Sequence, residues 1–246
     1  ETECRHAVDT AQQAFLLWQA QPVIKRVQVL YQFRALLIEH LDHVSHLITR
    51  DHGKVLEDAR GEVKRAIELI EHCCSAPLLL QGQYSQQVAT GVDCYTIRQA
   101  LGVCVSITPF NFPVMISTWL AIPAIVAGNC MVLKPSEKNP FSVMYLAELL
   151  QQAGLPNGVF NVVNGDKETV DQLITHPDVT AVTAVASTAV AQSIYQTAVA
   201  HGKRAATFGG AKNHAIVMPD ADWNEVIPAI MGAGFGAAGE RCMAIS

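Results

Sequence analysis

The sequence predicts an α/β fold organised around a doubly wound parallel sheet. Five short apolar runs alternate with helix-length segments between residues 102 and 208, which is the pattern of repeated β/α units. The stretch from Arg98 to Lys134 has no charged residue between its ends, so the helix within it is expected to be buried against the sheet. The predicted strands are Gly102–Ile107, Cys130–Leu133, Val159–Val163, Val179–Val185 and Arg204–Phe208.

Residues 1–80 are predicted to be the N-terminal helices of this domain. Apolar residues such as Leu30, Phe33 and Leu37 recur at intervals of three and four, as an amphipathic helix requires. Pro22 separates two such segments, and Gly53 is a predicted C-cap before the next one. Residues 1–80 therefore supply helices and no strand.

Two further regions flank the sheet. Residues 81–100 alternate loosely between glycines and predict a β arm apart from the main sheet. The five β/α units end near Phe208, so residues 101–209 form the central domain and residues 210–246 are expected to begin a second α/β domain. The first residue is Glu, and we interpret the sequence as a piece of a longer protein.

Composition excludes several classes of function. The net charge of −5 offers no basic footprint for nucleic acid. Pro109, Pro113 and Pro123 interrupt the uncharged stretch, which argues against a membrane span. The seven cysteines show no metal-ligand spacing, so no metal is expected, and no signal peptide is visible. We therefore expect a reducing, cytoplasmic location, or a mitochondrial one if an address lies upstream.

Polar residues follow the first two predicted strands, at the edge where open α/β sheets bind ligands. Asn111 lies in the loop Thr108-Pro-Phe-Asn-Phe-Pro113, which its prolines stiffen, and Lys134 and Glu137 follow the second strand. A carboxylate at Glu137 accepts hydrogen bonds from a ribose and repels a 2′-phosphate. The alternative is that Lys-Pro-Ser-Glu is an ordinary helix entry capped by Ser136.

Cys242 is the candidate nucleophile, in the segment Gly234-Phe-Gly-Ala-Ala-Gly-Glu-Arg-Cys242. Small residues allow close backbone packing around a thiol, and Arg241 favours its thiolate. The alternative is an inert buried cysteine. No Gly-x-Gly-x-x-Gly follows the first strand, so the ordinary dinucleotide fingerprint is absent.

These motifs together resemble the aldehyde dehydrogenase superfamily, whose members also lack that fingerprint. The segments around Asn111 and Cys242, with the helical run 47–75, are most similar to the N-terminal half of its methylmalonate/malonate-semialdehyde dehydrogenase branch. The resemblance implies a Rossmann-like NAD-binding domain at 101–209, with Cys242 as nucleophile and Asn111 as an oxyanion donor beside the Cys242 N–H. It also implies that NAD contacts Thr108, Phe110, Lys134, Glu137, Lys138 and Ser187.

The same resemblance implies the substrate and partners. Arg65 and Arg241 are candidates for gripping the carboxylate of a small semialdehyde, because a guanidinium pairs with it bidentately. The arm at 81–100 is implied to pair subunits, giving a homo-oligomer, either a dimer or a tetramer. Where relatives read aromatic-x-Gly-Ser-Thr, this chain has Ala186, whose methyl lies where backbone usually approaches the cofactor.

The reaction type is suggested by a missing carboxylate. Hydrolytic members carry a Glu after the fifth strand that activates water, but no Asp or Glu occurs between Asp178 and Asp220. Acyl transfer to coenzyme A needs no such base, so NAD-dependent CoA-acylating oxidation, giving propionyl-CoA or acetyl-CoA, is the function expected. Two alternatives stay open: a hydrolytic enzyme with another base, and a non-catalytic NAD-binding relative.

Overall fold

A five-stranded parallel sheet forms the centre of the molecule. The structure is a computed structural model that describes residues 2–245, so the predicted outer boundaries at Glu1 and Ser246 lie outside the described residues. The strand order is β5-β4-β3-β6-β7, with every neighbouring pair parallel, which confirms the predicted doubly wound sheet. The strands are β3 (Val103–Ile107), β4 (Cys130–Lys134), β5 (Phe160–Val162), β6 (Val179–Val185) and β7 (Arg204–Phe208).

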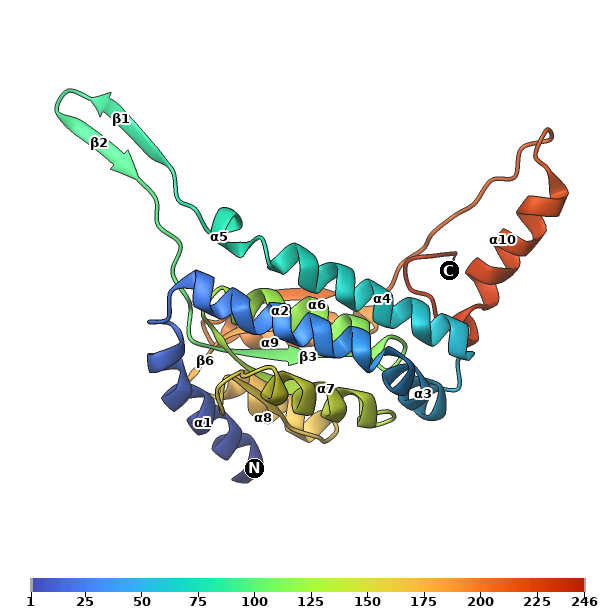
Figure 1. Ribbon diagram of the computed structural model, residues 1–246, viewed down its shortest axis with the longest axis horizontal. Helices are drawn as coiled ribbons and strands as arrows, with labels where there is room; N and C mark the ends of the chain where they lie inside the picture. Colours follow the sequence, from blue (N-terminus) through green and yellow to red (C-terminus); the bar gives the residue numbers. More distant parts are fainter. Residues whose placement is uncertain (1, 246) are drawn as a thin grey trace.

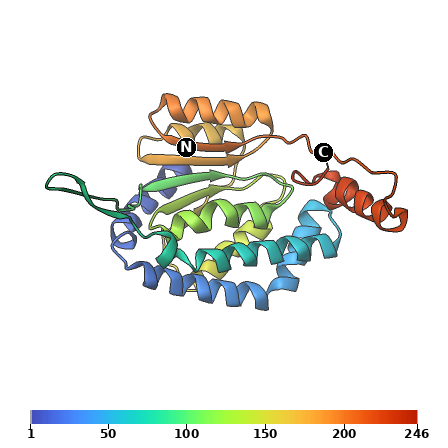
Figure 2. The same cartoon turned by 90° about the horizontal axis from the view of Figure 1, so that it is seen from above.

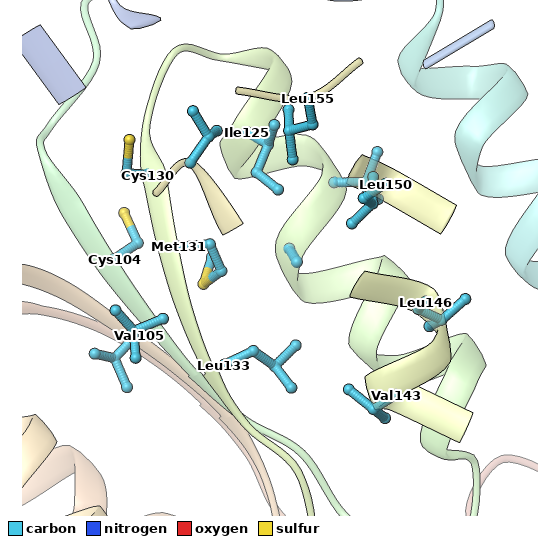
Figure 3. Packing of buried hydrophobic residues seen from close by; sticks show 14 of the residues in the cluster. Cys104, Val105, Ile125, Cys130, Met131, Leu133, Val143, Leu146, Leu150 and Leu155 are labelled. Atoms are coloured by element: carbon cyan, nitrogen blue, oxygen red, sulfur yellow. The ribbon is translucent and has the colours of Figure 1, made fainter. Parts of the chain in front are cut away.

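Helices cover both faces of the sheet (Figure 2). Helices α6 (Pro113–Val126) and α7 (Phe141–Gln152) lie on one face, whereas α8 (Lys167–Thr175) and α9 (Thr188–Ala200) lie on the other with α1 (Thr2–Trp18). Every residue of β3 and β4 is buried, as expected for central strands covered on both sides. In Figure 3, Leu133 of β4 extends toward Val143 and Leu146 of α7.

The remaining N-terminal helices form an outer layer over α6 and α7. These are α2 (Val23–Glu39), α3 (Leu41–His52) and α4 (Leu56–Cys73), followed by the short α5 (Ala76–Leu79). Gly53 caps α3 in the left-handed region, with φ of 88°, as its position in the sequence predicts. This cap matters for the site because it turns the chain directly into α4.

Two segments project from opposite ends of the molecule (Figure 1). One is the antiparallel hairpin of β1 (Tyr84–Ala89) and β2 (Val92–Tyr95), in which every residue is exposed. The other contains α10 (Trp223–Phe235), which has no buried residue, and the short 3-10 helix η1 (Ala237–Gly239). The core therefore lies almost entirely within residues 2–208.

Two predicted strands are shorter in the structure than in the sequence-based assignment. Gly102 precedes β3 because its φ of +134° is not a strand conformation, and a Cβ there would meet Thr180 at 3.1 Å. Val159 and Val163 fall outside β5, which pairs only with β4 at the edge of the sheet. Among residues 2–245, no helix combines the length and apolar character needed to cross a bilayer.

Candidate active site

A pocket opens where the strand order reverses. The chain moves from β3 outward to β4 and β5, then returns to β6 on the other side of β3, so the crevice between the carboxyl ends of β3 and β6 is a topological switch point. We call the pocket of about 350 Å³ there the switch-point pocket. It is lined by Pro109, Phe110, Asn111, Val185, Ala186, Ser187, Gly209, Gly210, Ala211, Gly239, Glu240, Arg241, Cys242 and Ile245.

Asn111 is held on the wall of this pocket between β3 and α6. Its side-chain Nδ2 donates a hydrogen bond of 2.8 Å to the carbonyl of Glu240, which ties the Asn111 loop to the segment that carries Cys242. Its Oδ1 is buried and accepts no hydrogen bond from the part of the chain that the structure describes. A primary amide has two N–H groups, so the bond to Glu240 leaves one available.

Lys134 and Glu137 form an ion pair at the end of β4, with Nζ and Oε2 3.1 Å apart. The Lys134 side chain is buried, whereas that of Glu137 is 55% exposed. Hydrogen bonds from its own backbone N–H and from Lys134 hold the pKa of Glu137 below its usual value, so this carboxylate is ionised at neutral pH. Ser136 does not cap a helix: its Oγ accepts from Lys138 N within a turn, and α7 starts only at Phe141.

The other predicted cofactor residues lie at different depths. Lys138 Nζ lies 4.3 Å from the centre of the Phe110 ring, and Phe110 lines the switch-point pocket. Thr108 is 3% exposed and accepts a hydrogen bond of 3.3 Å from Ser117, so its side chain faces the interior instead of that pocket. Any contact of Thr108 with a ligand in this pocket would therefore come from its backbone or require its side chain to rotate.

The N-terminus of α9 faces the switch-point pocket from β6. Ser187 is its exposed N-cap residue and makes no side-chain capping bond, which leaves backbone N–H groups of the first turn open to an anion. Gly209 and Gly210 follow β7 and pass close to Thr188: a Cβ at Gly209 would lie 3.1 Å from Thr188 Cα. The absence of side chains at these glycines keeps the pocket open.

Cys242 lies between the switch-point pocket and a second pocket of about 290 Å³, and it lines both. We call the second one the arginine pocket. It is lined by Glu57, Asp58, Gly61, Glu62, Arg65, Phe112, Met115, Arg241, Cys242, Met243 and Ala244. The carbonyl of Cys242 accepts a hydrogen bond of 3.3 Å from Asn213 Nδ2, which ties the thiol-bearing turn to the segment after β7. A nucleophile in this position reaches ligands in either pocket.

Both predicted carboxylate-binding arginines line the arginine pocket. Arg65, on α4, is 67% exposed at its side chain and pairs with Glu68 at 2.8 Å. Arg241 pairs through Nη2 with Asp58, whose second carboxylate oxygen accepts the N–H of Ala237 at 2.8 Å. The structure therefore brings both arginines and Cys242 to the lining of one pocket.

Four residues of the site were missed by the sequence-based reasoning: His52, Lys54, Asp58 and Glu62. Lys54 and Glu62 form a completely buried ion pair of 2.8 Å behind the Asn111 loop. His52 lies 3.3 Å from Glu240 and stacks on Phe110. Charged residues near the start of a helix normally face solvent. The four-residue spacing of Lys54, Asp58 and Glu62 is the sequence signal that could have indicated a shared role.

Three of the buried cysteines do not compete with Cys242 as nucleophiles. Burial raises the pKa of the thiols of Cys73 and Cys104 to about 11 and that of Cys130 to about 12, which keeps them protonated and unreactive. Within residues 2–245, one group places three possible metal-ligand atoms within 4.8 Å of one another, namely Asp9, His176 and Asp178. It lies at the amino end of β6, at the opposite end of the sheet from both pockets.

Comparison with known proteins identifies the family. Residues 1–246 match the Aldehyde dehydrogenase family along the whole chain. The chain belongs to the aldehyde dehydrogenase family. It is 50% identical over 240 residues to the malonate-semialdehyde dehydrogenase of Pseudomonas aeruginosa, an alignment that covers 98% of this chain and 48% of that protein. The chain thus spans about half the length of the curated relatives it matches.

Solved structures of the family superpose closely on the whole chain. The methylmalonate-semialdehyde dehydrogenase of Oceanimonas doudoroffii gives a TM-score of 0.96 at 52% identity, covering 99% of this chain and 50% of that one. A structure from Sinorhizobium meliloti, described as a putative methylmalonate-semialdehyde dehydrogenase complexed with NAD, gives 0.94 at 47% identity, covering 98% and 49%. The aldehyde dehydrogenase fold predicted from the motifs is therefore confirmed.

Proposed function

We propose that the full-length protein containing this chain oxidises malonate semialdehyde or its methyl homologue with NAD and transfers the acyl group to coenzyme A. One observation carries the choice of acyl transfer over hydrolysis. Between Asp178 and Asp220 the chain has no Asp or Glu, and Gly209, Gly210 and Ala211 line the switch-point pocket where a hydrolytic relative carries its base. A thiol needs less activation than water to attack a thioester, so the missing base is compatible with coenzyme A as acceptor.

Cys242 supplies the nucleophile in this scheme. Its thiolate adds to the aldehyde carbon, and the electron pair of the carbonyl moves to oxygen to give a hemithioacetal. The free N–H of Asn111 and the backbone N–H of Cys242 stabilise that oxygen. The hydrogen bond from Asn111 to Glu240 supports this assignment, because it joins the two loops that would share the reacting carbon.

The switch-point pocket suits a dinucleotide. Three features in and near the pocket fit such a ligand. They are the open N–H groups at the start of α9, the close approach of Gly209 to Thr188, and an ionised Glu137 held by Lys134. When bound, NAD would accept the hydride that leaves the hemithioacetal carbon. Glu137 would accept from the ribose hydroxyls and disfavour a 2′-phosphate through charge repulsion. Phe110, Lys138 and Ser187, together with the backbone of Thr108, complete the proposed cofactor residues.

The arginine pocket suits the carboxylate of the substrate. Arg65 and Arg241 would hold it while a thioester remains on Cys242. The carboxylate then leaves as carbon dioxide, its bonding electrons pass to the thioester enolate, and a proton takes its place. Attack by the coenzyme A thiol on the thioester carbon releases the Cys242 thiolate and gives acetyl-CoA or propionyl-CoA.

Product analysis of the full-length protein tests the proposal. Malonate semialdehyde and NAD are supplied with and without coenzyme A, and products are separated by chromatography and mass. We expect an acyl-CoA product with coenzyme A present and a large fall in NADH formation when it is omitted. Turnover that is independent of coenzyme A, with only free acid formed, would overturn the acylating assignment.

A hydrolytic reaction is the second candidate, because one carboxylate does line the switch-point pocket. Glu240 is two residues from Cys242, and its side chain is 41% exposed. Its Oε2 already contacts His52 at 3.3 Å, which directs it away from a role as free base. If Glu240 were the base, Glu240→Gln would abolish formation of free acid; under the acylating proposal this change leaves acyl-CoA formation largely intact.

We also propose that the β1–β2 hairpin pairs subunits of the full-length protein. All ten residues of its two strands are exposed, including the large apolar side chains of Tyr84, Val88, Val92 and Tyr95. Exposed apolar side chains grouped in this way are typical of an interface. Light scattering of the full-length protein with residues 83–96 replaced by a short Gly-Ser turn should show a smaller assembly than the unmodified protein.

A further inference from the structure

Three charged residues lie at four-residue spacing at the N-terminal end of α4: Lys54 precedes the helix, and Asp58 and Glu62 lie within it. Asp58 and Glu62 are four residues apart and so share one face of α4. Lys54 and Glu62 are only 1% and 2% exposed, so both side chains are directed into the molecule. The polar atoms of the three residues contact the two loops that bring Asn111 and Cys242 to the site.

Lys54 and Glu62 hold the Asn111 loop at Asn111 itself and at the start of α6. Lys54 Nζ donates to the backbone carbonyl of Asn111 at 2.5 Å and to Glu62 Oε2 at 2.8 Å. It also lies 4.0 Å from the centre of the Phe112 ring. Glu62 Oε1 accepts the N–H groups of Val114 at 2.8 Å and of Met115 at 3.1 Å, the first turn of α6.

Asp58 holds the Cys242 loop in the same way. One of its oxygens accepts the N–H of Ala237 and the other pairs with Arg241. Ala237 and Ala238 have φ values of 52° and 57°, a region that residues with a Cβ rarely adopt, so this turn needs external support. A Cβ at Gly236 would lie 2.6 Å from Arg241 Nε, which shows how closely the turn packs on the guanidinium.

Stability alone does not account for a buried pair of this kind. Removing two charges from water costs about as much as their attraction returns, and apolar residues of the same volume are often at least as stabilising. Burial raises the pKa of Glu62, while Lys54 and the two N–H donors oppose that shift. What the charges add is direction, because each of their hydrogen bonds fixes one backbone atom of a loop.

We propose that Lys54, Asp58 and Glu62 are positioning residues that hold the nucleophile and the oxyanion donor at a fixed separation by anchoring both loops to the N-terminal end of α4. This inference rests on the proposed function for the roles of Cys242 and Asn111. Displacement of a reacting group by about 1 Å costs roughly 10²-fold in rate. Loss of either anchor should therefore reduce kcat without a comparable change in NAD affinity.

The test uses the full-length protein with Asp58→Asn and Glu62→Gln, which keep the side-chain volumes. Glu71→Gln is the matched control, because Glu71 lies on the same helix but pairs with Arg34 in an exposed bridge. Three quantities are measured: kcat with the Kd for NAD, the rate of Cys242 alkylation by iodoacetamide resolved by peptide mass, and amide hydrogen exchange. We expect kcat to fall about 10²-fold in both test variants and to stay unchanged in Glu71→Gln.

Hydrogen exchange separates positioning from a general loss of stability. Asp58→Asn should accelerate exchange in residues 236–243 and change Cys242 alkylation, while residues 109–116 stay protected. Glu62→Gln should accelerate exchange in residues 109–116, while residues 236–243 stay protected. Lys54→Met is a further variant, and we expect it to change exchange in the same residues as Glu62→Gln. Its data are used only if the purified variant is folded. Equal loss of protection across both loops, or kcat and loop exchange within twofold of the unmodified protein, would overturn the inference.

The outcome is independent of whether the reaction has been assigned correctly. If the unmodified protein does not form NADH with any semialdehyde tested, the proposed function fails. The alkylation and exchange measurements still decide whether α4 anchors each loop separately. If the unmodified protein is active but exchange in the two loops does not respond selectively, the function stands and the positioning role is wrong.

Discussion

The loop that carries Asn111 and the loop that carries Cys242 meet at one site but are supported very differently. The Asn111 loop lies between β3, which is fully buried, and α6, which is largely buried, and the Lys54 and Glu62 side chains that contact it are closed to solvent. The Cys242 loop follows α10, a helix with no buried residue, and its main anchor is Asp58, whose side chain is 19% exposed. The Asn111 loop therefore packs within the buried core, whereas the Cys242 loop is held mainly by its contact with Asp58.

This difference indicates what each half of the site requires. Trp223, Ile227 and Met231 on α10 are more than half exposed, and an exposed apolar surface of this kind is typical of a protein–protein or domain interface. The 246 residues also span only about half the length of the relatives they match. The side of the site that carries Asn111 is thus supported by buried contacts within this chain, whereas the Cys242 side leaves an apolar surface exposed.

The largest expected effect follows from removing the nucleophile. In the full-length protein, Cys242→Ala should abolish NADH formation, because no other thiol of residues 2–245 lines either pocket. The Kd for NAD should change little, since the proposed cofactor contacts lie on the better supported side. Fluorescence titration with NAD checks the second point, and a parallel loss of NAD binding would show that Cys242 has a structural role instead.

Expression of residues 1–246 alone sharpens the comparison directly. We expect this chain to show no turnover, because the Cys242 loop lacks support on its open side and a loosely held thiol does not meet the geometric needs of catalysis. Amide exchange should be slow in residues 109–116 and fast in residues 236–243. Activity near that of the full-length protein would mean that the boundary drawn at residue 210 is wrong.

Asn111→Ala tests the better supported loop. Removing one oxyanion donor typically costs about 10²–10³-fold in kcat, and we expect a loss in that range in the full-length protein. Because Asn111 also donates to Glu240, the Cys242 loop should exchange faster in this variant. A kcat within a factor of about three of the original would remove Asn111 from the mechanism.

Cofactor choice should depend on Glu137 with a smaller effect. The full-length protein should prefer NAD to NADP, and Glu137→Gln should narrow that preference by removing the charge that repels a 2′-phosphate. The ratio of kcat/KM for the two cofactors is the measurement. An unmodified protein that uses both equally well would show that Glu137 does not face the ribose.

The smallest expected effect concerns His52, which contacts both loops through Phe110 and Glu240. Burial, followed by the charge of Lys54, lowers the pKa of His52, although Glu240 opposes this. The unfolded chain therefore binds a proton at this site more readily than the folded protein, and stability declines as pH falls below about 6.5. His52→Gln should weaken that acid-side decline in Tm, and an identical pH profile would contradict this.

The architecture could be predicted from local patterns, and the anchoring contacts could not. Strands β6 and β7 have the predicted bounds because each is a short run that lies between two helix-length segments, a pattern that allows few other folds. The bond from Asn111 to Glu240 joins residues 129 positions apart, and no periodicity encodes such a pairing. Lys54 shows the limit most clearly, because lysine at a helix start normally indicates solvent and here is buried against Glu62.

The proposed chemistry itself is tested most directly by trapping the acyl group on Cys242. Full-length protein is mixed with malonate semialdehyde and NAD without coenzyme A, quenched in acid, digested and analysed by mass spectrometry. We predict an acyl adduct on the peptide containing Cys242, which disappears with formation of acyl-CoA when coenzyme A is added before the quench. Formation of NADH with no adduct on Cys242, or loss of the adduct to free acid at the same rate without coenzyme A, would contradict the proposed reaction.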